Sequence, residues 1–222
     1  MKKTIFGLFV LSAILFSCKK DTGGDTNNPA TSYMSLTAGQ TRTYETTDNI
    51  AMSTSSNTTT STNRDTSVNS RTYHVFTNSD GSSDYFNVTG SDYYSFTQLP
   101  ALSNLQLELL YLKSNAAVNA SWNQTTNVTV PGVPFPLAVT ISNTIMEKGI
   151  SRTTGTMSHT DVIRVQTGIS VAGLPASALT TNIQSYYAPR YGLVESTAVL
   201  GLNYSGITDS VNTRTLLKAA NF

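Results

Sequence analysis

The chain contains a single cysteine, Cys18, in the stretch Leu15-Phe16-Ser17-Cys18, and its thiol is the most reactive side chain in the sequence. A thiol can attack an electrophile, bind a metal or pair in a disulfide. A disulfide within the chain needs a second cysteine, and a cysteine metal site needs several, so one thiol excludes both. Cys18 lies directly after an apolar run near the start of the chain, and this position favours covalent attachment of a group to its sulfur.

The residues before Cys18 have the pattern of an export signal. Lys2 and Lys3 precede a run that is apolar from Ile5 to Phe16, with only Gly7 and Ser12 as interruptions. A basic start followed by a short apolar segment is typical of a secretory signal. The run is shorter than the ~20 apolar residues that span a bilayer as a helix. We therefore interpret residues 1–17 as a signal peptide.

The stretch Leu15-Phe16-Ser17-Cys18 resembles the lipobox of bacterial prolipoproteins, in which a Leu and a small residue precede an invariant Cys. Phe16 is bulkier than the residue usual at its position. The resemblance implies a diacylglyceryl thioether on Cys18, cleavage before it and acylation of the new amino terminus. More than one acyl chain gives a durable membrane anchor. The resemblance implies a lipid-anchored protein of the cell envelope, most often at the outer membrane, facing the periplasm or the surface.

Residues 18–32 predict a flexible tether, because they contain no large apolar residue that could bury surface. Cleavage before Cys18 would remove Lys2 and Lys3 and change the formal net charge from +1 to about −1. Charge is sparse and balanced, so the sequence has no basic footprint for nucleic acid. Ser, Thr and Asn are abundant, and residues 33–222 have a length that suits one sizeable β domain.

The remaining candidates for chemistry are isolated. His74 and His159 are the only histidines, and no metal-ligand or general-base pattern surrounds them, so we expect surface or strand histidines. Ser170 lies in a stretch that differs from a nucleophile elbow by one residue and alternates as a strand does. Asp80-Gly81 predicts a hairpin turn more readily than a calcium loop. We expect no catalytic residue, no metal and no cofactor, and thus no enzyme.

Alternation of apolar and polar residues predicts that the domain is built from strands. In Val162–Val171, Ile163, Val165 and Ile169 fall on one face, and Leu193–Tyr204 alternates in the same way. Further strands are predicted at 41–52, 71–78, 83–89, 92–97, 105–113, 121–130, 137–147, 182–188 and 208–217. Short turns between them favour antiparallel pairing. Ser53–Ser70 is polar and of low complexity, and it predicts a long hairpin tip or a mobile loop.

The predicted fold class is therefore all-β, with a single antiparallel sheet of about ten strands. Twist accumulates across so many strands, and open edges invite aggregation, so the sheet is expected to curl into a barrel or half-barrel. A β-sandwich is the alternative. Val130–Leu137 contains three prolines and predicts a stiff apolar loop.

Two further stretches resemble a group of uncharacterised bacterial lipoproteins and secreted β proteins. Tyr33–Glu45 is similar to their start, an aromatic, a Leu, a Gly turn and Trp-x-Tyr, although Arg42 stands where Trp is usual. Tyr186–Ser196 is similar to their "YYAPGVGLV" hairpin, in which Pro189 presets φ and Gly192 can take a positive φ. The resemblance implies a curled antiparallel sheet of the lipocalin-like or lipoprotein-carrier-like kind.

The leading functional hypothesis is a non-catalytic, membrane-tethered protein that binds an apolar small ligand or lipid inside the sheet. Ile163, Val165 and Ile169 would contact the ligand, with Val133 and Phe135 at the mouth. Small β-barrels either fill with side chains or hold one ligand. The alternative is a structural protein with a filled core that contacts an envelope protein.

Overall fold

The structure is a computed structural model, which describes residues 32–99, 105–128, 136–204 and 207–222. These residues form twelve β-strands and one short 3-10 turn, η2 (Ala176–Ala178). Within these ranges the structure contains no helix that could cross a bilayer. The strands are β1 (Thr41–Asp48), β2 (Ser53–Val68), β3 (Arg71–Asn78), β4 (Ser83–Thr89), β5 (Asp92–Leu99), β6 (Leu105–Lys113), β7 (Ser121–Val128), β8 (Leu137–Thr154), β9 (Met157–Val171), β10 (Leu179–Ala188), β11 (Gly192–Tyr204) and β12 (Ile207–Asn221).

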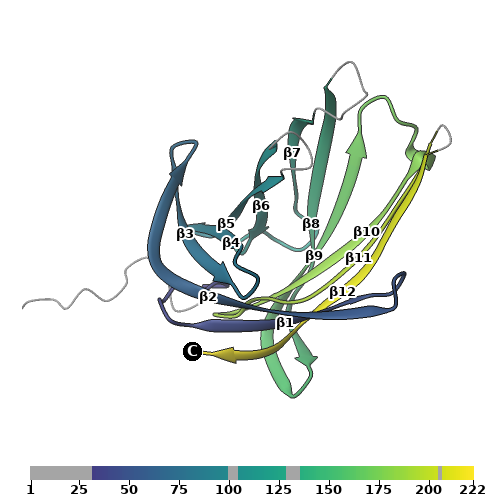
Figure 1. Cartoon of the computed structure of the whole chain (residues 1–222). Helices are drawn as coiled ribbons and strands as arrows, with labels where there is room; N and C mark the ends of the chain where they lie inside the picture. The colour runs from purple at the N-terminus through teal and green to yellow at the C-terminus, as the bar shows by residue number, and fades with distance from the viewer. Residues whose placement is uncertain (1–31, 100–104, 129–135, 205–206) are drawn as a thin grey trace, which may run out of the picture.

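All twelve strands belong to one antiparallel sheet with the order β6-β5-β4-β3-β2-β1-β12-β11-β10-β9-β8-β7. The first and last strands therefore pair in the middle, and the sheet curls upward from them on both sides (Figure 1). This curvature brings the two edge strands, β6 and β7, toward each other and nearly closes a barrel. The predicted single antiparallel sheet is confirmed, with twelve strands, and the sandwich alternative is wrong.

The prediction of a loop or hairpin tip at Ser53–Ser70 is also wrong, because residues 53–68 form the 16-residue strand β2. This strand pairs with β1 through its first half and with β3 through most of its second half. Threonine is β-branched and suits a pleated strand. Low complexity concealed an alternation in which Thr59 and Ser61 are buried.

One end of the barrel is filled by a core cluster, which consists of Tyr33, Met34, Phe76, Tyr93, Leu112, Ile145, Ile163, Val165 and Tyr187. Residues 32–40 enter this end ahead of β1. The backbone N–H of Tyr33 donates to the Tyr93 hydroxyl at 2.9 Å. The turn between β10 and β11 holds the same segment, since Ser35 N donates to Arg190 O at 3.0 Å and Arg190 N donates to Ser32 O at 2.7 Å. The stretches Tyr33–Glu45 and Tyr186–Ser196 thus contact each other.

The turn between β10 and β11 includes Pro189 and has two residues in the left-handed region, Arg190 with φ 69° and Gly192 with φ 75°. A Cβ added at Gly192 would lie 2.8 Å from the sulfur of Met34. Glycine therefore serves two needs here, because it accepts a positive φ and leaves room for a core side chain.

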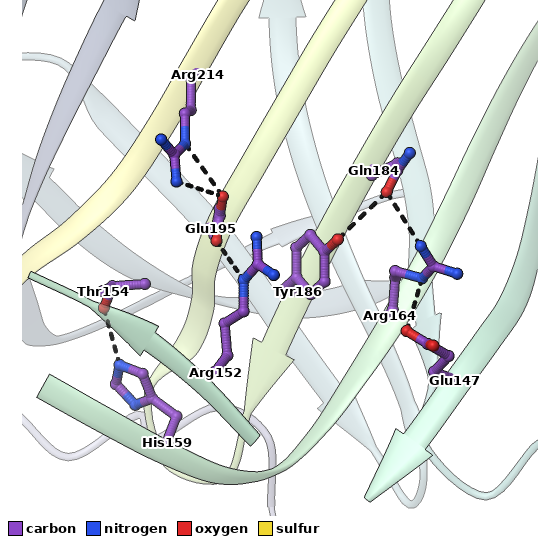
Figure 2. Close-up of polar contacts among 9 residues, drawn as sticks. All are labelled: Glu147, Arg152, Thr154, His159, Arg164, Gln184, Tyr186, Glu195 and Arg214. Atoms are coloured by element: carbon purple, nitrogen blue, oxygen red, sulfur yellow. Dashed lines mark hydrogen bonds and ion pairs between the residues drawn. The ribbon is translucent and has the colours of Figure 1, made fainter. Parts of the chain in front are cut away.

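The far end of the β8–β9 hairpin packs on β10–β12 through a second cluster that includes Val162, Val194 and Leu217. Polar contacts reinforce this packing (Figure 2). The carboxylate of Glu195, 2% exposed, accepts from Arg152 Nε at 2.5 Å and from Arg214 Nη2 at 2.9 Å. A single buried acid on β11 therefore joins the hairpin to β12.

We call the line where the edge strands β6 and β7 approach each other the seam. In the described sheet these two strands form no backbone ladder with each other, and side chains make the contacts across the seam. Leu110 N donates to Gln124 Oε1 at 2.6 Å. Leu110 O accepts from Trp122 Nε1 at 2.7 Å and from Asn143 Nδ2 at 3.3 Å. These contacts satisfy the N–H and C=O of Leu110, and unpaired groups of this kind on an edge strand can pair with another strand.

Candidate functional site

The candidate site is a cavity of about 460 Å³ inside the barrel. This volume falls in the range of about 300–1,000 Å³ that is usual for small-molecule sites. The residues that line it are Met34, Arg42, Tyr44, Thr46, Asn57, Thr59, Asp84, Phe86, Ser95, Leu109, Tyr111, Tyr187, Leu193 and Thr215.

Strand periodicity explains why these side chains meet. Residues two apart on a strand share a face, which places the sets 42/44/46, 57/59, 84/86 and 109/111 inside the barrel. Pairing across strands continues the rows, because Phe86 lies opposite Ser95 and Ser95 lies opposite Leu109. Alternation on five strands, β1, β2, β4, β5 and β6, thus supplies most of the wall.

The cavity begins where the core cluster ends. Met34 and Tyr187 belong to that cluster and also line the cavity. Phe86, Tyr111 and Leu193 pack against the cluster and face the cavity as well. We call the apolar end of the cavity next to the core cluster its floor. Beyond the floor, the lining includes hydroxyl and amide groups of Thr, Ser and Asn.

Arg42 is almost fully buried at 1% exposure. Its Nε donates to Tyr191 O at 2.7 Å, and its Nη2 donates to Ser35 O at 2.8 Å and Arg190 O at 3.2 Å. The guanidinium carbon lies 5.3 Å from the Phe76 ring centroid and 5.1 Å from that of Phe222. Arg42 thus ties residues 32–40 to the β10–β11 turn.

The Nη1 atom of Arg42 is buried and has no hydrogen-bond partner among the described residues. Burial lowers the pKa of Arg42 from its ordinary value, against the opposing effect of Tyr44 and Tyr111. A guanidinium nevertheless stays charged at neutral pH. The lining therefore includes a buried cation that backbone carbonyls and aromatic rings solvate and that no described carboxylate neutralises.

The other titratable groups of the lining are one carboxyl and three phenols. Burial raises the pKa of Asp84, against a hydrogen bond from Asn78 that lowers it. Burial also raises the pKa of Tyr44 and of Tyr187 to about 12. For Tyr111, burial raises the pKa well above the ordinary value. All three phenols are therefore neutral at physiological pH, and the hydroxyl of Tyr44 already donates to Leu193 O at 3.0 Å.

The residues predicted to contact a ligand lie elsewhere. Ile163 and Val165 are 0% and 1% exposed within the core cluster, and Ile169 is half-buried on β9 outside the cavity lining. Val133, Phe135 and Cys18, the residue predicted to carry the lipid, lie outside the described residues. Ligand contact by Ile163, Val165 and Ile169 stays a prediction. The cavity is lined mainly by residues of β1, β2 and β4–β6.

A second arrangement that sequence reasoning missed joins Ser61, Asp65 and His74. His74 Nδ1 lies 2.8 Å from Asp65 Oδ1, and His74 Nε2 lies 3.0 Å from Ser61 Oγ. These are the distances of a Ser-His-Asp triad. A bulge in β2 between Ser61 and Asp65 brings the two residues to one imidazole, and no spacing rule in the sequence predicts it.

The surroundings of Ser61 suit a structural role better than a nucleophile. Ser61 is 1% exposed, and its hydroxyl donates to Leu36 O at 2.9 Å. One hydroxyl proton cannot serve Leu36 O and His74 Nε2 at once. The backbone N–H of Ser61 is also engaged, with Gln40 O at 2.9 Å. The trio therefore ties residues 36–40 to β2 and β3.

The second histidine, His159, was expected at the surface or in a strand and is a buried strand residue at 3% exposure. Its Nε2 lies 3.0 Å from Thr154 Oγ1, and its ring packs edge-on against Tyr191. Across the described residues, no three His, Cys, Asp or Glu side chains lie close enough together to hold a metal ion.

A smaller cavity of about 220 Å³ lies at the seam between β6 and β7. It is lined by Asn69, Leu107, Glu108, Leu109, Gln124, Thr125, Thr126 and Ile141. Leu109 lines this cavity and the interior cavity alike. Leu109 is therefore the residue that the linings of the two cavities share.

Comparison with known proteins finds likeness only at the level of the fold. No family model matches the sequence, and no curated protein matches it. A protein described as a presumed lipoprotein from Parabacteroides distasonis ATCC 8503 has a similar structure, with a TM-score of 0.54 and 13% identity over 86% of this chain and 99% of that chain. A presumed exported protein with a YmcC-like fold from Bacteroides fragilis NCTC 9343 gives a TM-score of 0.42 and 9% identity over 85% of this chain and 98% of that chain. The chain thus shares its curled antiparallel sheet with the Parabacteroides protein.

Proposed function

We propose that the protein is a non-catalytic lipoprotein of the bacterial cell envelope whose β domain binds an apolar or amphipathic small molecule in its interior cavity. The observation that carries this proposal is the 460 Å³ cavity, whose floor is made by Met34, Phe86, Tyr111 and Leu193. Concave, largely apolar sites with a few placed polar groups are typical of small-molecule binding.

The proposed anchor consists of acyl chains on Cys18, followed by a tether over residues 18–32. Two or more acyl chains hold a protein at a bilayer durably. The anchor would place the cavity within reach of lipids, most simply at the outer membrane. The membrane is thus one proposed partner. It is also a proposed source of the ligand.

The decisive measurement is native mass spectrometry on the mature chain, residues 18–222, carrying Cys18→Ser and purified without detergent. This form lacks its own acyl chains, which could otherwise enter the cavity. We expect a co-purifying apolar molecule, and uptake of the neutral probe N-phenyl-1-naphthylamine with a rise in its fluorescence. Neither a bound molecule nor probe uptake would contradict ligand binding.

A cavity-filling substitution separates the interior from other apolar surfaces. Ser95 is a small residue on the cavity wall, and Ser67 is an exposed residue on β2. Ser95→Trp should abolish uptake of the probe, whereas Ser67→Trp should leave it unchanged. Equal effects of the two variants would place the probe outside the cavity.

The alternative function is a structural protein that contacts an envelope partner. The core cluster is the observation that favours this alternative. Ile163 and Val165 pack against other side chains and leave no room for a ligand within the cluster. An empty cavity in the native mass spectrum, together with crosslinks to one envelope protein, would support this alternative.

A further inference from the structure

We propose that the ligand carries a carboxylate head that binds the buried guanidinium of Arg42, with its apolar chain in the remaining cavity. The ligand class is thus a long-chain monocarboxylate, such as a fatty acid. This inference rests on the proposed function and adds the chemistry of the ligand to it.

The first argument is the contrast between Arg42, which has no ion pair among the described residues, and four arginines that do. Arg71 pairs with Glu108, Arg164 with Glu147, and both Arg152 and Arg214 with Glu195. The side chains of these four arginines are 27% to 51% exposed. Arg42, at 1% exposure, is far more buried and has no carboxylate within salt-bridge distance among the described residues. A buried cation without an anion is costly, so the most buried arginine is the one that would gain most from one.

The second argument is that one nitrogen of the guanidinium has no hydrogen-bond partner among the described residues. Nε and Nη2 donate to three backbone carbonyls, which fixes the plane of the group. Nη1 is buried without a partner, although Arg42 lines the cavity. A ligand head at the Arg42 side of the cavity would therefore meet these unpartnered N–H groups. A charge-assisted bond from a prepositioned guanidinium is stronger than a neutral one.

The third argument concerns the charge of the head. Only one nitrogen of Arg42 is unpartnered, which suits a single carboxylate oxygen better than a phosphate with several charged oxygens. The neutral phenol of Tyr111 lines the same cavity and can donate a further hydrogen bond. Asp84 is the acidic residue of the lining and would repel a doubly charged head more than a singly charged one.

The apolar part of the ligand follows from the rest of the lining. Phe86, Leu109 and Leu193 offer aliphatic and aromatic surface on the same lining. A flexible chain gains free energy in proportion to the apolar area that it buries, without directional contacts. The site therefore specifies the head by charge and the chain by size alone.

The test compares ligands that differ only in their heads. Dodecanoate, dodecanol and dodecylammonium are titrated calorimetrically, below their aggregation limits and at pH 8, into residues 18–222 carrying Cys18→Ser. We expect dodecanoate to bind about 10- to 100-fold more tightly than dodecanol, from one hydrogen bond to a charged group. Dodecylammonium should bind most weakly. This series needs no variant of the site and so does not depend on whether a variant folds.

A pair of variants then assigns the preference to one residue. Arg42→Met should bring dodecanoate to the affinity of dodecanol, whereas Arg152→Met, on the outer network, should leave the preference intact. Equal affinities of the three ligands for the unsubstituted site, or a preference for the ammonium, would overturn the carboxylate proposal and leave apolar binding standing. Failure of all three ligands and of the neutral naphthylamine probe would overturn both proposals.

Discussion

The side-chain oxygen of Gln124 on β7 accepts a hydrogen bond from the backbone N–H of Leu110 on β6 at 2.6 Å, across the seam of the barrel. Side chains thus replace a backbone ladder where the curled sheet meets itself. The same amide group also reaches Glu108 O through Nε2 at 3.4 Å. The seam is consequently the place where the barrel is held by the fewest contacts and where single substitutions should have local effects.

We predict that Gln124→Met lowers the free energy of unfolding by about 1–3 kcal/mol, because it leaves the Leu110 N–H without its acceptor. Methionine preserves the length of the side chain and most of its apolar contacts. Amide exchange at Leu110 should become faster. Both quantities can be read from denaturant unfolding and hydrogen exchange followed by NMR.

The matched control is Gln166→Met on β9, whose amide nitrogen donates to the side-chain oxygen of Asn182 at 3.4 Å on an exposed face. This control should change stability by less than about 0.5 kcal/mol. If Gln124→Met were equally mild and Leu110 exchange unchanged, the seam would depend on other contacts.

The strands were largely predictable because period-2 alternation is a local property. Ile163 and Val165 were correctly assigned to an inward face, and their burial in the core confirms that part of the reading. What the sequence could not supply was how far the core extends. Which inward residues fill the barrel and which line a cavity depends on residues 32–40 entering one end, and this is a long-range event.

The site residue Arg42 was missed for a similar reason. Its carbonyl partners on the β10–β11 turn lie 148 and 149 residues away in sequence. One signal was present in the sequence, since the charged Arg42 alternates with Tyr44, and both side chains line the cavity. A charged residue at an inward-facing position of a strand indicates either that the strand is exposed or that the charge is buried. Only the structure shows which of these is the case.

Glu195 gives a second prediction, because it is the shared acid of the network in Figure 2. Glu195→Gln should lower the free energy of unfolding by about 1.5–3 kcal/mol, as bonds between charged groups are lost in a buried site. Glu147→Gln is the control, because Glu147 is 45% exposed in its pair with Arg164 and should cost less than about 1 kcal/mol. Equal losses in the two variants would argue against a special role for the buried acid.

The same carboxylate should make stability depend on acid. Burial raises the pKa of Glu195, but hydrogen bonds and charges from Arg152 and Arg214 outweigh burial and lower it below the ordinary 4.5. A folded-state pKa below the unfolded one stabilises the fold above pH 4.5, and this contribution is lost as the pH falls further. Glu195→Gln should flatten that part of the stability profile.

His159 predicts a loss of stability at milder acidity. Burial lowers its pKa below the ordinary 6.5, so the unfolded chain binds a proton more readily than the folded one. Stability should therefore fall as the pH drops from about 7.5 through 6.5 and level off below the folded-state pKa. His159→Phe should remove this slope, as measured by unfolding at several pH values. An unchanged slope would assign the effect to another group.

The trio of Ser61, His74 and Asp65 offers a direct test of whether a triad-like geometry implies catalysis. A serine nucleophile must be reached by its substrate and must give its proton to the histidine. Ser61 is 1% exposed and donates to Leu36 O. Its role should therefore be to hold residues 36–40 against β2.

We accordingly predict that a fluorophosphonate probe does not label the folded protein at Ser61, and that 4-nitrophenyl acetate is not hydrolysed above the rate of a His74→Gln variant. Ser61→Ala should instead lower the free energy of unfolding by about 1–3 kcal/mol, because Leu36 O loses its donor in a buried site. Peptide mapping by mass spectrometry identifies any labelled residue. Stoichiometric labelling of Ser61 that requires His74 would mean that the barrel opens enough to expose a working nucleophile, and the non-catalytic proposal would then be wrong.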